Sequence, residues 1–408
     1  MIKEQYRSTI MDTTLSIVNS QMESVRNKNI TKTSQRVYKD GFIGAAGTIG
    51  TFSEDELLKE GQQALEKRIE YPVEPTMHQT MSHDMRQPII AAHKLLEEFS
   101  TLLEDLKKRQ PHFIFSNKIS LTEVQSSLVN DAGLHLDYYD RCLSSGIIFK
   151  EKTSTSVFDG GLGFQERKYD RKLILEEFDL ILNAYREKVE LPKKGRYPII
   201  FATEEAPVDK FVSDLKADVF AQGGSLFSEK LGQKLFNETF TFGQNVDPKV
   251  AINTPFFDAE GMINPGFVFN LIEDGVLKSP YCDKKTAHKY GFSPSGSAVA
   301  PYDGVPQTAL IKPTIKKTST NLKALLGGQM GIVVLMAAGG DFTPQGDYAT
   351  PVQLAMLFDG ERPLGRLPEF NLSSNVYDMF GKGFRGVAPN NFMPFSTYEF
   401  AVLEMNLS

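Results

Sequence analysis

Tryptophan is absent from this sequence, and cysteine occurs only twice, as Cys142 and Cys282. Two cysteines are too few for a disulfide framework or a four-cysteine zinc site, so we expect a reducing, cytoplasmic environment. No apolar run approaches the roughly 20 residues that a membrane span needs, and the segment MIKEQYRSTIMDTTLSIV lacks a signal-peptide core. We therefore expect neither a disulfide scaffold nor a membrane partner.

An excess of positive charge is also missing. The 45 Lys and Arg residues stand against 51 Asp and Glu residues, which gives a net charge of −6, so we expect no nucleic-acid partner. Apolar residues make up 41% of the chain and include 29 Phe, enough for a large core. At roughly 100 to 200 residues per domain, the length of 408 residues indicates two or three folded units.

The first half alternates between strand and helix patterns. Residues 34–50 predict a β-hairpin that turns at Asp40-Gly41, and Ser53 with Glu56 has the spacing of a helix-capping box. An amphipathic helix is predicted between Pro88 and Pro111, β-type runs from 116 to 163, and a second helix from 170 to 188. We expect an amino-terminal domain over 1–190, with sub-units of about 1–110 and 111–190.

A change of composition marks the main boundary. The segment LPKKGRYP, residues 191–198, interrupts both periodicities with two prolines, a glycine and three basic residues. Beyond it the pattern predicts a short buried strand, a helix from about 207 to 220, and almost only β-strands after Gly224. The predicted fold class is α+β: a two-unit α/β amino-terminal domain followed by a β-rich, antiparallel carboxy-terminal domain over 191–408.

Five sequence blocks follow one another in the second half. They are GGSLFSEKLGQKLF (223–236), the Asp-x-Glu-Gly segment FFDAEGMINPGFVFNLIEDGVLKSPYCDKKTAHKYGF (256–292), SPSGSA (293–298), GGDFTPQGDYA (339–349) and LFDGERPLGRLPEFNLSSNVYDMFG (357–381). Their order resembles the TldD/PmbA family. GFIGAAGTIGTFSEDELLKEGQQAL in the first half is similar to the glycine-rich hairpin and helix of that family. One departure is Ser297, where the family usually has Asn.

The resemblance implies a cytoplasmic peptidase system, also known by the label modulator of DNA gyrase, whose two related subunit kinds process or degrade peptides. The TldD kind carries a His-Glu-x-x-x-His zinc motif, and the PmbA kind, also called TldE, lacks it. In this chain no histidine is followed by Glu, and none occurs between His135 and His288, where the motif should lie. The chain is therefore closer to the PmbA/TldE kind.

His78 and His83, in MHQTMSHD, are the only tempting metal ligands. Five residues rotate about 140° on a helix, so both rings would meet one ion only if the backbone were distorted. Gln79 cannot act as a base, and we predict that both histidines lie on a loop before the helix that starts near Pro88. Cys282 and His288 could form a nucleophile and base, but a lone Cys and His do not make a zinc site.

Ser295, Gly296 and Ser297 precede a loop that contains Tyr302, and this segment could border a peptide-binding cleft. The alternative is an ordinary turn between strands. The leading hypothesis is a TldE-like subunit with no catalytic residue, metal or cofactor of its own, which pairs with a zinc-bearing TldD-type subunit or with itself. Its substrate would be a peptide or an unfolded protein. The alternatives are a stand-alone peptide-binding or regulatory homologue and a peptidase with an unrecognised site.

Overall fold

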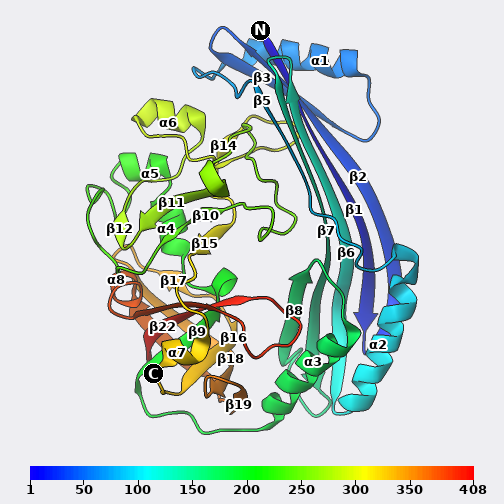
Figure 1. Ribbon diagram of the computed structural model, residues 1–408, viewed down its shortest axis with the longest axis vertical. Coiled ribbons are helices and arrows are strands. Elements are labelled where there is room, and N and C mark those ends of the chain that lie inside the picture. The colour runs from blue at the N-terminus through cyan, green and yellow to red at the C-terminus, as the bar shows by residue number, and fades with distance from the viewer.

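The computed structural model describes residues 1–408 and has the expected α+β class, with antiparallel sheets in both halves of the chain (Figure 1). The first half, residues 1–190, forms one sheet of eight strands in the order β4-β3-β2-β1-β6-β7-β5, with β8 beside β7. Its strands are β1 (Ile2–Val18), β2 (Gln21–Lys39), β3 (Phe42–Ile49), β4 (Ile69–Glu70), β5 (Gln79–Asp84), β6 (Phe113–Asn130), β7 (Leu134–Glu151) and β8 (Gly160–Glu166). Its helices are α1 (Glu54–Gln63), α2 (Leu95–Arg109) and α3 (Arg171–Arg186).

Tight turns connect the long strands of this sheet. Asp40 and Gly41 have φ values of 51° and 77°, as a two-residue hairpin turn of type I′ requires, so the predicted turn is confirmed. The N-cap of α1 is also confirmed, because the Ser53 hydroxyl accepts the Glu56 amide. The predicted split near residue 110 does not follow the strand pairing: β1 pairs with β6 along most of its length, which joins both proposed sub-units in one sheet.

The second half, residues 191–408, is built mainly from short strands. They are β9 (Gly195–Ala202), β10 (Phe242–Asn245), β11 (Val268–Glu273), β12 (Val276–Leu277), β13 (Ala298–Val299), β14 (Gln307–Thr308), β15 (Pro313–Ile315), β16 (Gly331–Ala337), β17 (Asp341–Phe342), β18 (Asp347–Phe358), β19 (Pro363–Arg366), β20 (Phe370–Asn375), β21 (Phe384–Pro389) and β22 (Glu399–Leu407). The helices are α4 (Asp209–Asp214), α5 (Ala217–Ala221), α6 (Lys284–Tyr290), α7 (Leu322–Leu326) and α8 (Val376–Met379). The main sheet runs β16-β9-β22-β20-β18 and closes on itself through pairing between β16 and β18.

The helix predicted from about 207 to 220 is two short helices. The chain is extended at Lys216 (φ −68°, ψ 127°), between α4 and α5. There the backbone exchanges hydrogen bonds with Tyr281: the Ala217 amide donates to the Tyr281 carbonyl, and the Tyr281 amide donates to the Leu215 carbonyl. A long-range pairing therefore interrupts the helical pattern that the local sequence favours.

Strand pairing separates the two halves near residue 191, but the apolar core does not. One cluster joins residues of the first sheet and of α3, such as Phe149 and Phe178, to Leu354 and Val402 of the second half. A second cluster, centred on Phe211, lies within the second half. None of the helices combines the length and apolar character that crossing a bilayer requires.

One strand stands apart from this packing. From Glu23 to Asn29, β2 is exposed on both faces, and β3 pairs only with residues 32–39 of it. The segment has β1 on one side and a free edge on the other (Figure 1).

Candidate functional site

Helix α4 lies where the family resemblance places the zinc motif. Lys210 and Asp214 stand one helical turn apart on it, both almost fully buried, and their Nζ and Oδ2 atoms are 3.0 Å apart. Asp214 also accepts the Leu226 amide at 2.8 Å. A protonated lysine has no lone pair to give to a metal, so this paired segment does not fit zinc.

Of the two candidate histidines, His78 lies in an irregular segment as predicted, whereas His83 lies in a strand. His83 belongs to β5, which pairs in parallel with β7, and its ring packs against Phe256 and Phe267 at centroid distances of 4.8 and 5.6 Å. His78 is exposed and comes directly before β5. No group of three or more His, Cys, Asp or Glu side chains has the arrangement of a metal site.

Ser295 and Ser297 are fully buried. The Ser295 hydroxyl donates to the Cys282 carbonyl at 2.9 Å, and Ser297 donates to Gln244 Oε1 at 2.9 Å. The Gly296 carbonyl accepts a hydrogen bond from Nε2 of the same Gln244 side chain at 2.6 Å. These three residues form a buried network of hydrogen bonds, and neither serine side chain reaches solvent. Their place in a peptide cleft stays a prediction.

Tyr302 lies apart from these buried residues and packs against the hairpin of β2 and β3. Its carbonyl approaches Gly47 so closely that a Cβ added to Gly47 would lie 2.0 Å from the oxygen. The Lys32 ammonium is 5.6 Å from the centre of its ring. The loop that carries Tyr302 therefore packs directly against the first half of the chain.

Cys282 and His288 do not form a catalytic pair. The Cys282 thiol is fully buried and donates to the Ser293 carbonyl, whereas His288 is exposed on α6. Burial raises the pKa of the Cys282 thiol to about 12, and the carboxylate of Asp283 adds to this shift. A thiol in this state is not a nucleophile near neutral pH.

The Asp-x-Glu-Gly block makes buried polar contacts with the first half of the chain. Glu260 is 2% exposed, and its Oε1 accepts the Tyr71 hydroxyl at 2.8 Å. The carbonyls of Ala259 and Glu260 accept hydrogen bonds from Arg36 Nη1 and from the Thr76 hydroxyl. Three residues of the first half thus donate hydrogen bonds to two successive residues of the second half. We call this group of contacts between the two halves the carboxyl junction.

Lys284 completes the carboxyl junction from the start of α6. Its amide donates to Glu260 Oε2 at 2.8 Å, and its Nζ reaches back to the Thr76 hydroxyl at 2.7 Å. Burial lowers the pKa of Lys284. Burial also raises the pKa of Asp258 to about 6 and, together with the neighbouring Asp258 charge, that of Glu260 to about 8. Two acids with separated pKa values at a buried contact are a common property of functional sites.

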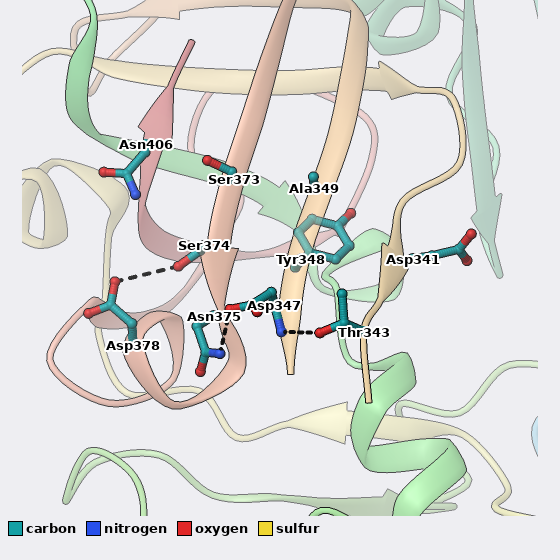
Figure 2. A pocket seen from close by; sticks show the side chains of 10 residues that line it. All are labelled: Asp341, Thr343, Asp347, Tyr348, Ala349, Ser373, Ser374, Asn375, Asp378 and Asn406. Atoms are coloured by element: carbon teal, nitrogen blue, oxygen red, sulfur yellow. Dashed lines mark hydrogen bonds between the residues drawn. The ribbon is translucent and has the colours of Figure 1, made fainter. Parts of the chain in front are cut away.

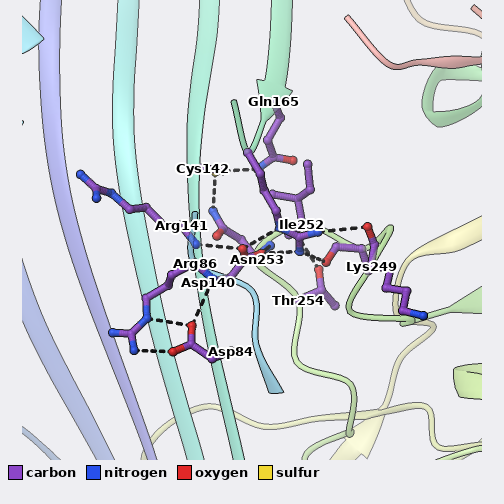
Figure 3. A network of polar contacts seen from close by, with 12 residues as sticks. Asp84, Arg86, Asp140, Arg141, Cys142, Gln165, Lys249, Ile252, Asn253 and Thr254 are labelled. Carbon is purple, nitrogen blue, oxygen red and sulfur yellow. Dashed lines mark hydrogen bonds and ion pairs between the residues drawn. The ribbon is translucent and has the colours of Figure 1, made fainter. Parts of the chain in front are cut away.

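A second contact between the halves is shown in Figure 3. Asp140 of β7 accepts the Asn253 amide at 2.6 Å, and the Asn253 side chain donates to Cys142 Sγ at 2.9 Å. Arg167 pairs with Asp140 at 2.7 Å. Burial alone would raise the pKa of Asp140, but the hydrogen bonds from Arg167 and Asn253 hold it below its usual value. The charge of Asp140 is thus paired with that of Arg167, and we interpret this contact as structural.

A polar pocket of about 520 Å³ opens on the closed sheet of the second half (Figure 2). Its lining combines three aspartates with amides and hydroxyls: Asp341, Thr343, Asp347, Tyr348, Ala349, Ser373, Ser374, Asn375, Asp378 and Asn406. Asn375 donates to Asp347 at 2.9 Å, and Arg196 pairs with Asp378 at 2.5 Å. No histidine, cysteine or lysine lines the pocket, and its polar groups are carboxylates, amides and hydroxyls.

The five sequence blocks contain the segments of the second half that build the carboxyl junction and most of this pocket. No local pattern, however, marks either place as a site. Tyr71 and Glu260 are 189 residues apart, so their contact leaves no trace in local spacing. One local signal was available: Asp258 and Glu260 stand between two phenylalanines and the apolar pair Met262-Ile263, which indicates buried carboxyl groups.

Comparison with known proteins agrees with this architecture. A family model described as the PmbA/TldA metallopeptidase C-terminal domain matches residues 194–398, half of the chain. A protein of Archaeoglobus fulgidus named metalloprotease is 25% identical over 353 residues, which cover 82% of this chain and 79% of that one.

Two solved structures show the same fold over the whole chain. TldE from Thermococcus kodakarensis superposes with a TM-score of 0.76 at 16% identity, covering 100% of this chain and 96% of that one. A Thermotoga maritima protein described as a modulator of a DNA gyrase gives 0.79 at 14% identity, with the same coverage. The chain belongs to the PmbA/TldD family.

Proposed function

We propose that this chain is the TldE-like subunit of a TldD/PmbA-type metallopeptidase system and works in the cytoplasm without a zinc site of its own. The observation that carries this proposal is the pair formed by Lys210 and Asp214, which occupies the segment where the TldD kind holds its zinc. The protein acts by pairing with a zinc-bearing TldD-type chain, and the mixed pair cleaves peptides or unfolded segments.

The free edge of β2 supports a role in assembly. From Glu23 to Asn29 this strand exposes both faces and leaves one edge unpaired, and a partner subunit can cover such an edge. A specific interface of this kind should bury at least about 1,000 Å² in total.

Two measurements test the proposal. Metal analysis after dialysis should find far less than one equivalent of zinc on the isolated chain. Light scattering and peptide cleavage should be measured with and without a zinc-bearing TldD-type chain from the same source, and we expect a mixed complex and a change in cleavage.

One equivalent of zinc that disappears in His78→Ala or His83→Ala would overturn the proposal. So would a strict monomer that leaves cleavage by the TldD-type chain unchanged. Cys282→Ser is the matched control, because the buried thiol takes no part in the proposed activity.

A stand-alone binding protein is the second candidate, and the polar pocket favours it. The pocket presents aspartate, amide and hydroxyl groups, as a binding site for a polar or cationic ligand would. Peptide binding that persists in the isolated chain and is lost on Asp347→Asn would support this role.

A further inference from the structure

The polar pocket of the second half owes its shape to one small side chain. Asp341, Ala349, Ser373 and Asn406 occupy paired positions on four neighbouring strands, β17, β18, β20 and β22, and form one row across the sheet (Figure 2). Residues paired in this way project from the same face of a sheet. The short methyl group of Ala349 therefore leaves a hollow between the longer side chains of its neighbours.

Two carboxylates of the polar pocket have no cationic partner. Asp378, the third aspartate of the pocket, is paired with Arg196 at 2.5 Å. Asp341 and Asp347 form no ion pair, and the only hydrogen bond to the Asp347 carboxylate comes from the Asn375 side chain at 2.9 Å. Two negative charges thus line the hollow without a balancing cation, which favours a cationic group of a ligand.

A second depression of about 780 Å³ adjoins the polar pocket, and Asn375 and Asp378 line both. Its two lysines pair with acidic side chains, so it adds little net charge. Half-buried Leu235 and Tyr377 give it an apolar side, and the ring of Tyr377 stacks on that of Phe236 at a centroid distance of 5.8 Å. This adjoining pocket therefore suits an apolar side chain.

We propose that the polar pocket and the adjoining pocket form one groove for an extended peptide segment that carries a cationic side chain close to an apolar one. The cationic group lies over Ala349 between Asp341 and Asp347, and the apolar side chain packs against Leu235 and Tyr377. Side chains two residues apart in an extended chain point the same way, so a Lys-x-Phe segment can place one in each pocket. The inference rests on the second candidate role above and specifies its ligand.

Titration calorimetry of the whole chain with a short peptide tests the groove. The probe is acetyl-Gly-Lys-Gly-Phe-Gly-amide, whose only charge is the lysine ammonium. Gln in place of Lys should weaken binding about tenfold, and Ala in place of Phe at least about threefold. Concentrated salt should weaken binding of the Lys probe more than that of the Gln probe, because the carboxylates lie close to solvent.

Two variants of the chain locate the binding. Ala349→Leu fills the hollow at an exposed strand position without changing a charge, and it should weaken binding of the probe by more than about tenfold. Asp341→Asn removes one of the two unpaired charges and should weaken it several-fold. Ala221→Leu on α5 and Asp40→Asn at the hairpin turn are the matched controls, and both should bind like the unmodified chain.

The outcomes separate the groove from the functions proposed above. Failure of the unmodified chain to bind the probe, or equal affinity for the Lys and Gln probes, would overturn the groove. So would unchanged binding in Ala349→Leu, which leaves the second candidate role intact but puts the site elsewhere. If Ala349→Leu does not fold, Asp341→Asn decides. The complex with a TldD-type chain is measured independently of this probe, so its result bears on the subunit role alone.

Discussion

The two halves of this protein meet in two different ways. At one end, α3 and the first sheet share an apolar core with the second half, in which Phe149 and Phe178 pack in the same cluster as Leu354, and the buried Glu177 of α3 adds hydrogen bonds to residues 395 and 396. At the other end, the carboxyl junction joins the halves through Glu260, Tyr71 and Arg36. The apolar contact gains free energy from burial in proportion to area, whereas the charged contact must first offset the cost of desolvation. The first contact therefore depends mainly on buried apolar area, and the second on charges and hydrogen bonds that are satisfied away from water.

Removal of Arg36 should have the largest effect on the charged contact. Arg36→Met leaves Glu4 buried without its cation, and we expect a loss of about 4 kcal/mol in the free energy of unfolding, measured by urea titration. The double variant Arg36→Met with Glu4→Gln should recover much of that loss. Equal stability of the single and double variants would show that the stranded charge is not the cause.

A cavity in the apolar contact should cost somewhat less. Leu354 is 1% exposed, and a Cβ added to Gly160 of the first half would lie 2.6 Å from its Cδ2. Leu354→Ala should lower the free energy of unfolding by about 3 kcal/mol, with no dependence on pH between 6.5 and 9. Leu231→Ala, at a half-exposed position, should change it by less than about 0.5 kcal/mol. A loss at Leu354 that varies with pH would erase the distinction between the two contacts.

The smallest effect is expected where backbones touch. Gly47→Ala places a methyl group against the Tyr302 carbonyl and should cost about 1–3 kcal/mol, because backbone must shift to make room. Faster hydrogen exchange around residues 298–305 would locate the disturbance. Gly161→Ala, whose nearest neighbour lies at 3.7 Å, should be close to neutral. If both substitutions behave alike, the close approach at Gly47 does not hold the loop.

Local signals were sufficient for much of the fold. The turn at Asp40-Gly41, the cap at Ser53 and the apolar faces of α2 and α3 follow from turn geometry, capping chemistry and a 3.6-residue period. The pairing of β1 with β6 carries no such signal, because much of both strands is polar and their partners lie over 100 residues apart.

The candidate site was less accessible to sequence reasoning. His78 and His83 stand out in the sequence, yet β5 places His83 against two phenylalanines and leaves His78 exposed. Tyr71 and Arg36 belong to no motif, and only the folded chain brings them to the Asp-x-Glu-Gly block. The family blocks marked the right segment, and long-range packing decided what its acids contact.

The free edge of β2 bears on how the protein behaves at high concentration. The Thr31 carbonyl points to that edge, where it accepts the Gly50 amide, so the backbone groups of alternate residues down to Val25 point the same way. An antiparallel copy of this strand centred on residue 26 would set Arg26 against Arg26, and one centred on residue 27 would set Arg26 against Lys28. Like charges directly opposite oppose such pairing. Concentrated salt screens this repulsion, so it is the condition under which strand-to-strand aggregation of the pure protein would begin.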